Sequence, residues 1–375
     1  MVKMTFREMN LNVFEGRPNS RVLFQPRVEP WYDWHRSFGS LPERYREFEL
    51  REFLDDLGLS MRYMHYYTGN PDPVVRCLSP AVRVHEQFGD AIGARVYETP
   101  YGDLIESYKF TVDRTWREVG FPVREVADLK KLVWLFEEMT YHFSESAFEQ
   151  GSSYMGGRGI PQFWVPKSPY QALVQQWMKL DDFIYALADA PGEIERVMQA
   201  IDVSYDSLYE EMIVSGAVQI VNFGENLHEQ LLSPRYFERY FIPFYERRVG
   251  QLKRAGIYSH VHIDGYFRSL LKYLKDLPFD GYEALTPLPQ GDVALEEIKE
   301  YIGDKVLLDG IPAVMFLSSY TPDALMATVE RVVGLFHPRL ILGVSDEVPQ
   351  GAGDNAIARL RMVSDWCRDY AAPSH

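Results

Sequence analysis

Residues 305–347, KVLLDGIPAVMFLSSYTPDALMATVERVVGLFHPRLILGVSDE, contain the pattern that decides the fold. KVLLDGIP is typical of a buried strand, and RLILGVSDE is typical of another. Between them, TPDALMATVERVVGLF has helical spacing, with Thr321 as a predicted N-cap before Pro322. A strand, a helix and a strand joined by short turns indicate a parallel βαβ unit.

The same alternation extends over the second half of the chain. Strands are expected to begin near five residues: Val218, Ile257, Gly281, Val306 and Leu340. Three earlier apolar segments, 21–27, 61–67 and 160–166, bring the expected total to about eight strands. This α/β pattern predicts a (β/α)₈ TIM barrel, and a doubly wound open sheet is the alternative. No GxGxxG motif follows these strands, so the signature of a dinucleotide site is missing.

Residues 70–150 interrupt this alternation. The segment 93–123, GARVYETPYGDLIESYKFTVDRTWREVGFPV, alternates apolar and polar residues on both sides of Pro100–Tyr101–Gly102. That pattern predicts an antiparallel β-hairpin. Because loops at a barrel mouth commonly carry function, we expect this insertion to be a lid or a substrate-binding element. No repeat or low-complexity linker divides the chain, so we predict one domain, 1–375, that contains the insertion.

The composition excludes several classes of protein. The formal net charge is −15, whereas a nucleic-acid-binding protein needs a basic face. The two cysteines, Cys77 and Cys367, form no CxxC pattern, so a disulfide scaffold is not expected. No run of about 18 apolar residues predicts a transmembrane helix, and the first residues do not resemble a signal peptide. We therefore expect a cytoplasmic protein that binds neither nucleic acid nor membranes.

Polar residues gather where the predicted strands end. In TIM barrels the active site lies at the carboxyl ends of the strands. At least four separate strand ends of this chain carry a carboxylate or an imidazole, and together the ends carry Arg27, Glu29, Trp31, Lys167, Glu225, Asn226, His228, His260, His262, Asp264, Glu283, Asp309, Ser345, Asp346 and Glu347. The sequence therefore predicts an active site at this end of the barrel.

The segment 256–267, GIYSHVHIDGYF, holds three of these groups at alternate positions. Side chains two apart on a strand share a face, so His260, His262 and Asp264 are expected to point the same way. Two imidazoles and a carboxylate suit zinc or another divalent ion, with Asp346 as a further ligand. The alternative interpretation is that one histidine belongs to the core and that Asp264 caps a helix beginning near Tyr266.

Other groups also allow two interpretations. Arg27 is either a substrate-binding residue or part of an ion pair at the barrel rim. Glu225 is either a catalytic acid or the cap of the next helix. Trp31 and Tyr101 either contact substrate or only pack against their neighbours.

Four segments resemble the uroporphyrinogen decarboxylase superfamily, and the resemblance covers about residues 20–370. They are GENLHEQLLSPRYFERYFIPFYERR (224–248), SHVHIDG (259–265), GYEALTPLPQGDVALEEIKEYIGDKVLLDGI (281–311) and LILGVSDEVPQGAGDNAIARL (340–360). The resemblance implies a (β/α)₈ barrel. True decarboxylases of this superfamily carry two arginines in an N-terminal motif. Here FQPRVEPW (24–31) keeps Arg27 at the first position and has Trp31 at the second, which argues against porphyrinogen decarboxylation.

The second branch of the superfamily comprises cobalamin-dependent methyltransferases that bind zinc through HxCG and a later cysteine. By this resemblance His262 matches the histidine, Asp264 replaces the first cysteine, and either Asp346 or Glu347 replaces the second. Zinc or another divalent metal is thus implied, in a harder site that favours activation of oxygen over sulfur. The implied reaction moves a methyl group from a small O- or N-methylated donor to a corrinoid (cobalamin) on a partner protein.

The resemblance and the strand-end positions together suggest roles for individual residues. Glu225 and His260 are candidate general acids. The candidate substrate-binding residues are Arg27, Trp31, Tyr101, His228 and Glu283. One alternative is a decarboxylase of a carboxylated ring or porphyrin-like substrate, in which Arg27 and Arg158 clamp carboxylates. Another is a tetrapyrrole- or corrinoid-binding protein without catalysis. The resemblance suggests a homodimer.

Overall fold

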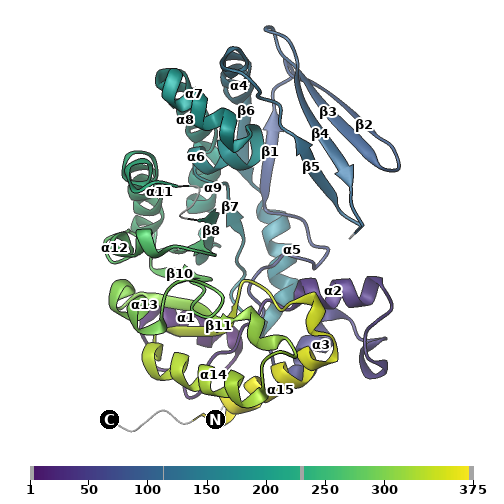
Figure 1. Ribbon diagram of the computed structural model, residues 1–375, viewed down its shortest axis with the longest axis vertical. Helices are drawn as coiled ribbons and strands as arrows, with labels where there is room; N and C mark the ends of the chain where they lie inside the picture. Colours follow the sequence, from purple (N-terminus) through teal and green to yellow (C-terminus); the bar gives the residue numbers. More distant parts are fainter. Residues whose placement is uncertain (1–3, 113, 229–231, 371–375) are drawn as a thin grey trace. The chain divides into compact units, whose positions relative to one another are not determined.

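A computed structural model describes residues 4–112, 114–228 and 232–370 (Figure 1). The chain forms two compact units. The first, here called the barrel unit, comprises Met1–Pro73, Glu145–Val165 and Gly216–His375. The second unit comprises Val74–Ser144 and Pro166–Ser215, so it contains helices that lie beyond the predicted insertion at 70–150. Within the described ranges, no helix is both long and apolar enough to cross a membrane.

A parallel six-stranded sheet forms most of the barrel unit. Its strands pair in the order β12-β11-β10-β9-β8-β7. Their near-continuous apolar composition is typical of strands that are covered on both faces. The bounds are β7 (Trp164–Val165), β8 (Ile220–Leu227), β9 (Tyr258–Ile263), β10 (Gly281–Glu283), β11 (Val306–Pro312) and β12 (Leu340–Ser345).

Two short extended segments continue this sheet into a ring. Phe24 forms a parallel bridge with Leu342 of β12, and the backbone N–H of Ser60 donates to the carbonyl of Phe24 at 3.0 Å. Tyr63 in turn bridges Gln162, which precedes β7. Segments near residues 24 and 60–63 therefore link β12 to β7, and eight parallel strand positions follow one another around the ring. The predicted TIM barrel is confirmed.

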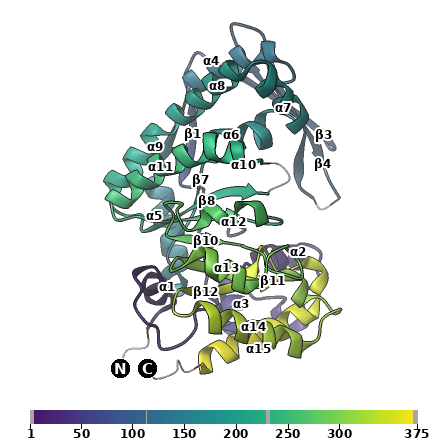
Figure 2. The same ribbon diagram turned by 60° about the vertical axis from the view of Figure 1, so that its left-hand side comes forward.

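Helices alternate with these strands, as βαβ units require. In α14 the side chain of Thr321 accepts from the N–H of Ala324, as its predicted capping role requires, and the buried stripe packs against β11 and β12. Figure 2 shows α14 and α15 together beneath β11. The α-helices of the barrel unit are α1 (Phe6–Glu15), α2 (Glu29–Ser37), α3 (Leu50–Leu57), α5 (Glu145–Met155), α10 (Pro234–Tyr236), α11 (Ile242–Arg254), α12 (Leu271–Leu274), α13 (Leu295–Ile302), α14 (Pro322–Phe336) and α15 (Asp354–Asp369).

Helix α1 closes the amino-terminal end of the barrel. Its buried residues Met9, Val13 and Phe14 form one core cluster with the first residues of several strands. Those strand residues include Leu23, Ile160, Ile220, Val306 and Ile341. With this end filled by apolar side chains, the polar residues of the strands lie toward the carboxyl end.

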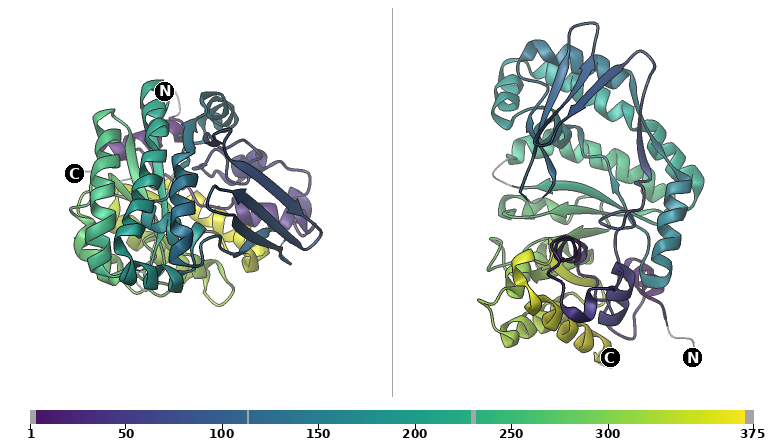
Figure 3. Two further views of the ribbon diagram at one scale, coloured as in Figure 1. Left: turned by 90° about the horizontal axis from the view of Figure 1, so that it is seen from above. Right: turned by 90° about the vertical axis from the view of Figure 1, so that its right-hand side faces the viewer.

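The second unit is built around two antiparallel sheets. The strands β2 (Arg83–Phe88), β3 (Ile92–Glu98), β4 (Leu104–Phe110) and β5 (Trp116–Gly120) lie side by side, and they are dark blue in the left view of Figure 3. Tyr97 pairs with Leu104 across the Pro100–Gly102 turn, so the predicted hairpin is confirmed. Its role as a lid stays a prediction. The remaining elements are β1 (Val74–Leu78), β6 (Met139–Phe143), α4 (Leu129–Glu137), α6 (Pro169–Ala172), α7 (Leu180–Asp189), α8 (Pro191–Ser204) and α9 (Asp206–Ser215).

Candidate active site

Unusual backbone angles mark the carboxyl ends of four strands. Six non-glycine residues in the described ranges have positive φ, and four of them lie on or just after β8, β10, β11 and β12. They are Asn226 (51°), Ala284 (66°), Asp309 (90°) and Asp346 (75°). Such conformations cost about 1–3 kcal/mol each for L-residues, and they cluster at functional sites. The strain therefore points to the same end of the barrel as the polar residues.

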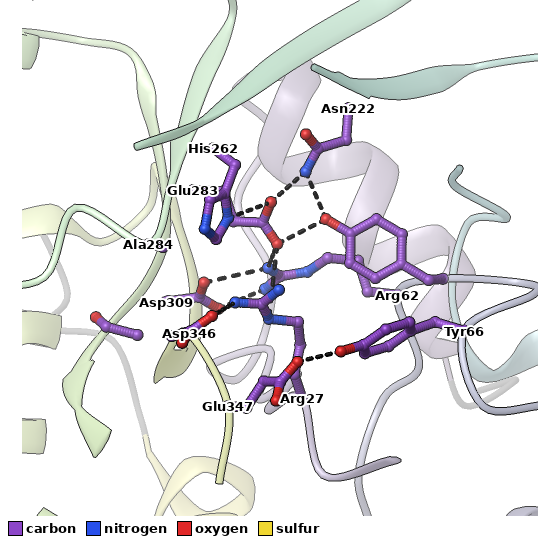
Figure 4. A network of polar contacts seen from close by, with 12 residues as sticks. Arg27, Arg62, Tyr66, Asn222, His262, Glu283, Ala284, Asp309, Asp346 and Glu347 are labelled. Atoms are coloured by element: carbon purple, nitrogen blue, oxygen red, sulfur yellow. Dashed lines mark hydrogen bonds and ion pairs between the residues drawn. The ribbon is translucent and has the colours of Figure 1, made fainter. Parts of the chain in front are cut away.

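Glu283, the last residue of β10, lies at the centre of a buried polar network (Figure 4). One carboxylate oxygen accepts from Nη1 of Arg62 and from the hydroxyl of Tyr63, both at 2.6 Å. The other accepts from Nδ1 of His262 at 3.3 Å and from the side-chain amide of Asn222. Four donors from three segments of the chain thus hold one carboxylate in the barrel.

Two arginines balance the charge of Glu283. Burial alone would raise its pKa, but Arg27 and Arg62 outweigh burial and hold the pKa of Glu283 well below its usual range. Arg62 also donates from Nη2 to Asp309 at 2.7 Å. Burial raises the pKa of Asp309 despite this contact. Removing any one of these charges would leave its buried partners with less compensation.

Arg27 is the member of the network with an exposed partner. The Arg27 side chain is 6% exposed, and its Nη2 donates to Asp346 at 2.8 Å, whereas the Asp346 side chain is 52% exposed. Nε of Arg27 is buried, lies 3.9 Å from Glu283, and has no hydrogen-bond partner among the residues that the structure describes. Arg27 therefore combines a buried positive charge with a partner that an anionic group can replace. We call Arg27, Arg62, Tyr63, Asn222, His262, Glu283, Asp309 and Asp346 the mouth network.

One ring nitrogen of His262 binds Glu283 of the mouth network, and the other faces Asp264. With Nδ1 donating to Glu283, Nε2 is the acceptor nitrogen, and it lies 4.0 Å from the Asp264 carboxylate. Asp264 is not the cap of the helical turn that follows. The carboxylate of Asp292 accepts instead from the N–H groups of Phe267 and Arg268, at 3.2 and 3.3 Å.

The predicted metal ligands do not all converge. His262 and Asp264 face each other, but Asp346 binds Arg27. Among residues 4–112, 114–228 and 232–370, no group of three or more His, Cys, Asp or Glu side chains is arranged to hold a metal ion. Glu347, the other proposed last ligand, accepts from the hydroxyl of Tyr66. A bound metal stays a prediction from the sequence, and no step below is derived through it.

His260 belongs to the barrel core. It is fully buried, and its Nε2 lies 2.7 Å from the side-chain oxygen of Gln162. Burial lowers its pKa to about 3, with the positive charge of Arg62 acting in the same direction. The imidazole is therefore neutral near pH 7, and its Nδ1 lies 3.9 Å from Glu283. The general-acid role of His260 stays a prediction. His260 and His262 share a face of β9 but lie at different depths.

Two further predictions are corrected by position. Trp31 is fully buried in α2, with its ring 4.3 Å from His35 and 6.0 Å from Phe53, so it packs in the core rather than contacting substrate. Arg158 precedes its strand, at the amino end of the barrel, and forms an ion pair with Asp55. It cannot clamp a substrate together with Arg27, which follows its strand.

The structure also places the other predicted residues, Glu225, His228 and Tyr101. Glu225 is buried in β8. The ring of His228 lies 5.7 Å from that of Tyr266, and a Cβ at Gly265 would lie 2.5 Å from it, so this glycine makes room for the imidazole. Tyr101 lies in a turn of the second unit and is 52% exposed.

The sequence interpretation missed Arg62, Tyr63 and Asn222 as site residues, and it did not assign a role to Asp309. A signal was present for Arg62 and Asn222, because each stands within an apolar strand. A charged or amide side chain on a buried strand needs partners, and partners of this kind commonly form a site.

The comparisons with known proteins agree with this architecture. The family model Uroporphyrinogen decarboxylase (URO-D) matches residues 173–363, which is just over half of the chain. A methyltransferase from Methanosarcina mazei is structurally similar, with a TM-score of 0.59 and 14% identity, over 96% of this chain and 99% of that chain. A B12-independent methionine synthase from Shewanella sp. W3-18-1, in complex with selenomethionine, has a TM-score of 0.44 and 12% identity over 93% and 97%. A search of curated proteins found no match. The chain belongs to the uroporphyrinogen decarboxylase family.

Proposed function

We propose that the protein is a methyltransferase that moves a methyl group from a small O- or N-methylated donor to a reduced corrinoid carried by a partner protein. The family and the fold are those of an enzyme, and the similar fold of the Methanosarcina methyltransferase is compatible with this reaction. The corrinoid would supply the nucleophile that accepts the methyl group. The side chains of this chain would bind the donor and hold its reacting atom at the carboxyl end of the barrel.

The observation that carries the proposal is the charge of the mouth. Formal negative charges outnumber positive ones, because four carboxylates accompany two guanidiniums: Glu283, Asp309, Asp346 and Glu347 against Arg27 and Arg62. A substrate with several carboxylates would be repelled here, whereas a neutral or cationic donor would not. Arg158, the second arginine of the predicted carboxylate clamp, lies at the other end of the barrel.

His262 would orient the methyl donor, and Glu225 would donate a proton to its leaving group. Glu283 fixes the ring of His262 through Nδ1, so Nε2 is held toward the space beside Asp264. For an O-methylated donor, the departing oxygen needs a proton, and Glu225 stays the predicted general acid. An N-methylated ammonium donor leaves as a neutral amine and needs none.

The test is the absorbance change of reduced cobalamin mixed with the protein and candidate donors. We expect donor-dependent loss of the reduced corrinoid and at least a hundredfold slower loss with His262→Gln. His337→Gln is a matched control, because His337 follows α14 at the amino end of the barrel. Equal rates for wild type and His262→Gln would contradict the proposal.

A decarboxylase remains the second candidate, because Arg27 is buried and its partner Asp346 is exposed and exchangeable. A substrate with a single carboxylate would suit this arrangement. Release of CO₂ from such a substrate, with no methylation of the corrinoid, would favour this function.

A further inference from the structure

An aromatic corner stands beside the mouth network. The rings of Trp164 and Tyr63 are stacked, with centroids 4.2 Å apart and planes at 28°. Two other rings meet Trp164 nearly at right angles: Tyr66 at 5.0 Å and 84°, and His65 at 5.1 Å and 85°. Tyr66 also meets Tyr67 edge-on at 4.6 Å. Trp164 and Tyr66 are half-buried, and Tyr67 is exposed.

Two contacts fix the position of Trp164. The hydroxyl of Tyr63, its stacking partner, donates to Glu283, so the stack is tied directly to the mouth network. A Cβ at Gly224 of β8 would lie 2.7 Å from Cδ1, an atom at the edge of the Trp164 indole. Gly224 therefore lets the indole lie against the strand. The aromatic corner is held in place by the barrel before any ligand binds.

A carboxylate accompanies this corner. The hydroxyl of Tyr66 donates to Glu347, which is half-buried (Figure 4). Burial and the charge of Glu347 both raise the pKa of Tyr66, so the phenol stays neutral and the negative charge remains on Glu347. The nearest basic residue of the network, Arg27, is already paired with Asp346.

Perpendicular aromatic faces with an adjacent carboxylate have a recognised ligand chemistry. The electron-rich faces of Trp and Tyr attract a cation that cannot donate hydrogen bonds, and the attraction is strongest when the cation is desolvated. A primary ammonium group, in contrast, has three N–H groups to donate, and Glu347 already accepts a hydrogen bond from Tyr66. A phosphate or a carboxylate would be repelled by Glu347.

We propose that Trp164 and Tyr66, with Glu347, bind the quaternary ammonium group of the methyl donor. This inference rests on the proposed function, because it names the substrate class of the same site. In the reaction the C–N bond breaks and its electron pair stays on nitrogen. The methyl carbon accepts an electron pair from the reduced corrinoid. The departing amine is neutral, so no proton is consumed and no general acid is needed.

The experiment compares choline with its uncharged isostere 3,3-dimethylbutan-1-ol, with binding measured by calorimetry on the full chain. We expect choline to bind at least tenfold more tightly than the isostere. Trp164→Leu is expected to remove this preference. Glu347→Gln is expected to lower the affinity for choline several-fold and to leave the affinity for the isostere unchanged. Trp366→Leu is the control, because Trp366 is also half-buried and packs against a tyrosine, Tyr370, at 5.2 Å.

Equal affinities for choline and the isostere would overturn the inference, as would a full preference in a folded Trp164→Leu variant. If Trp164→Leu does not fold, the inference is tested by Glu347→Gln alone, and an unchanged affinity for choline in that variant would overturn it. Failure of the proposed function gives a different result. Selective choline binding without methyl transfer would keep the ammonium site and reject the methyltransferase. Methyl transfer from an uncharged donor, without choline binding, would do the opposite.

Discussion

Replacement of Arg62 by methionine is the sharpest test of how the mouth network is held together. Arg62 is 1% exposed and donates to three partners: Glu283 at 2.6 Å, Asp309 at 2.7 Å and Gln25 at 3.0 Å. Methionine keeps much of the volume but removes the charge and all donors. Two buried carboxylates would then face each other with only Arg27 nearby.

The expected magnitude follows from this loss. Breaking a buried ion pair by removing one partner costs about 3–5 kcal/mol. A domain is stable by only about 5–15 kcal/mol, so Arg62→Met removes a large part of the free energy of unfolding. The control is Arg331→Met, since Arg331 and Glu296 form an ion pair of similar length, 2.7 Å, with both side chains about half exposed. That pair is expected to contribute at most about 1 kcal/mol.

The assay is equilibrium unfolding in urea at pH 5 and pH 7. In the Arg62→Met variant the pKa of Asp309, already raised by burial, rises further because its guanidinium partner is gone. A raised carboxyl pKa favours the folded state at low pH, so the penalty should be smaller at pH 5 than at pH 7. A penalty below about 1 kcal/mol, or one that does not change with pH, would refute the network as the support of the site.

Three further predictions concern single groups. Burial raises the pKa of Glu29 from 4.5 to about 7, so its contribution to stability is present below pH 4.5 and is lost as pH rises through 7. Relative to Glu29→Gln, the wild type should lose about 3 kcal/mol between pH 4.5 and pH 8 in denaturant titrations, and parallel curves would contradict this. Thr321→Ala should cost about 1 kcal/mol of unfolding free energy through the lost cap of α14, and an unchanged midpoint would contradict it. Elemental analysis should find one divalent ion per chain, absent from His262→Ala, if Asp346 leaves Arg27 for a metal. A metal-free wild type would reject the metal prediction.

The barrel was predictable because its signal is local. Each strand is a short apolar run, and each helix has its own spacing and start signals, such as Thr321 before Pro322. Eight such units leave few arrangements, since parallel strands must be joined by helices. The end of the barrel where the candidate site residues gather was predictable for the same reason, because all carboxyl strand ends lie at one end. Arg27, His262 and Glu283 do meet there.

The pairings inside the site were not predictable, because they depend on depth and on distant segments. His260 and His262 share a strand face, yet only His262 reaches Glu283 with a hydrogen bond. Two residues that are two positions apart on a strand share a face of the sheet. Their spacing does not tell in which layer of the barrel each side chain lies. Asp346 follows its strand in a left-handed conformation, and no local pattern indicates that it binds Arg27, 319 residues away.

The second unit shows another limit. Its β-hairpin was visible as an alternation of apolar and polar residues with a turn between them, and Tyr97 and Leu104 pair as expected. The predicted insertion covers only 70–150 and omits the helices from 166 to 215, because a helix that follows a strand has the same sequence pattern in either unit. Membership of a compact unit depends on contacts between distant segments, which periodicity does not report.

The most direct test of the central claim is a mass balance with a donor whose N-methyl carbons are isotopically labelled. The protein, the labelled quaternary ammonium donor and reduced cobalamin are incubated, and the products are quantified by mass spectrometry. We expect one labelled methyl group on the corrinoid for each donor molecule that loses one, and at least a hundredfold less with His262→Gln. No label on the corrinoid with any O- or N-methylated donor, accompanied by CO₂ release from a carboxylated ring, would contradict it.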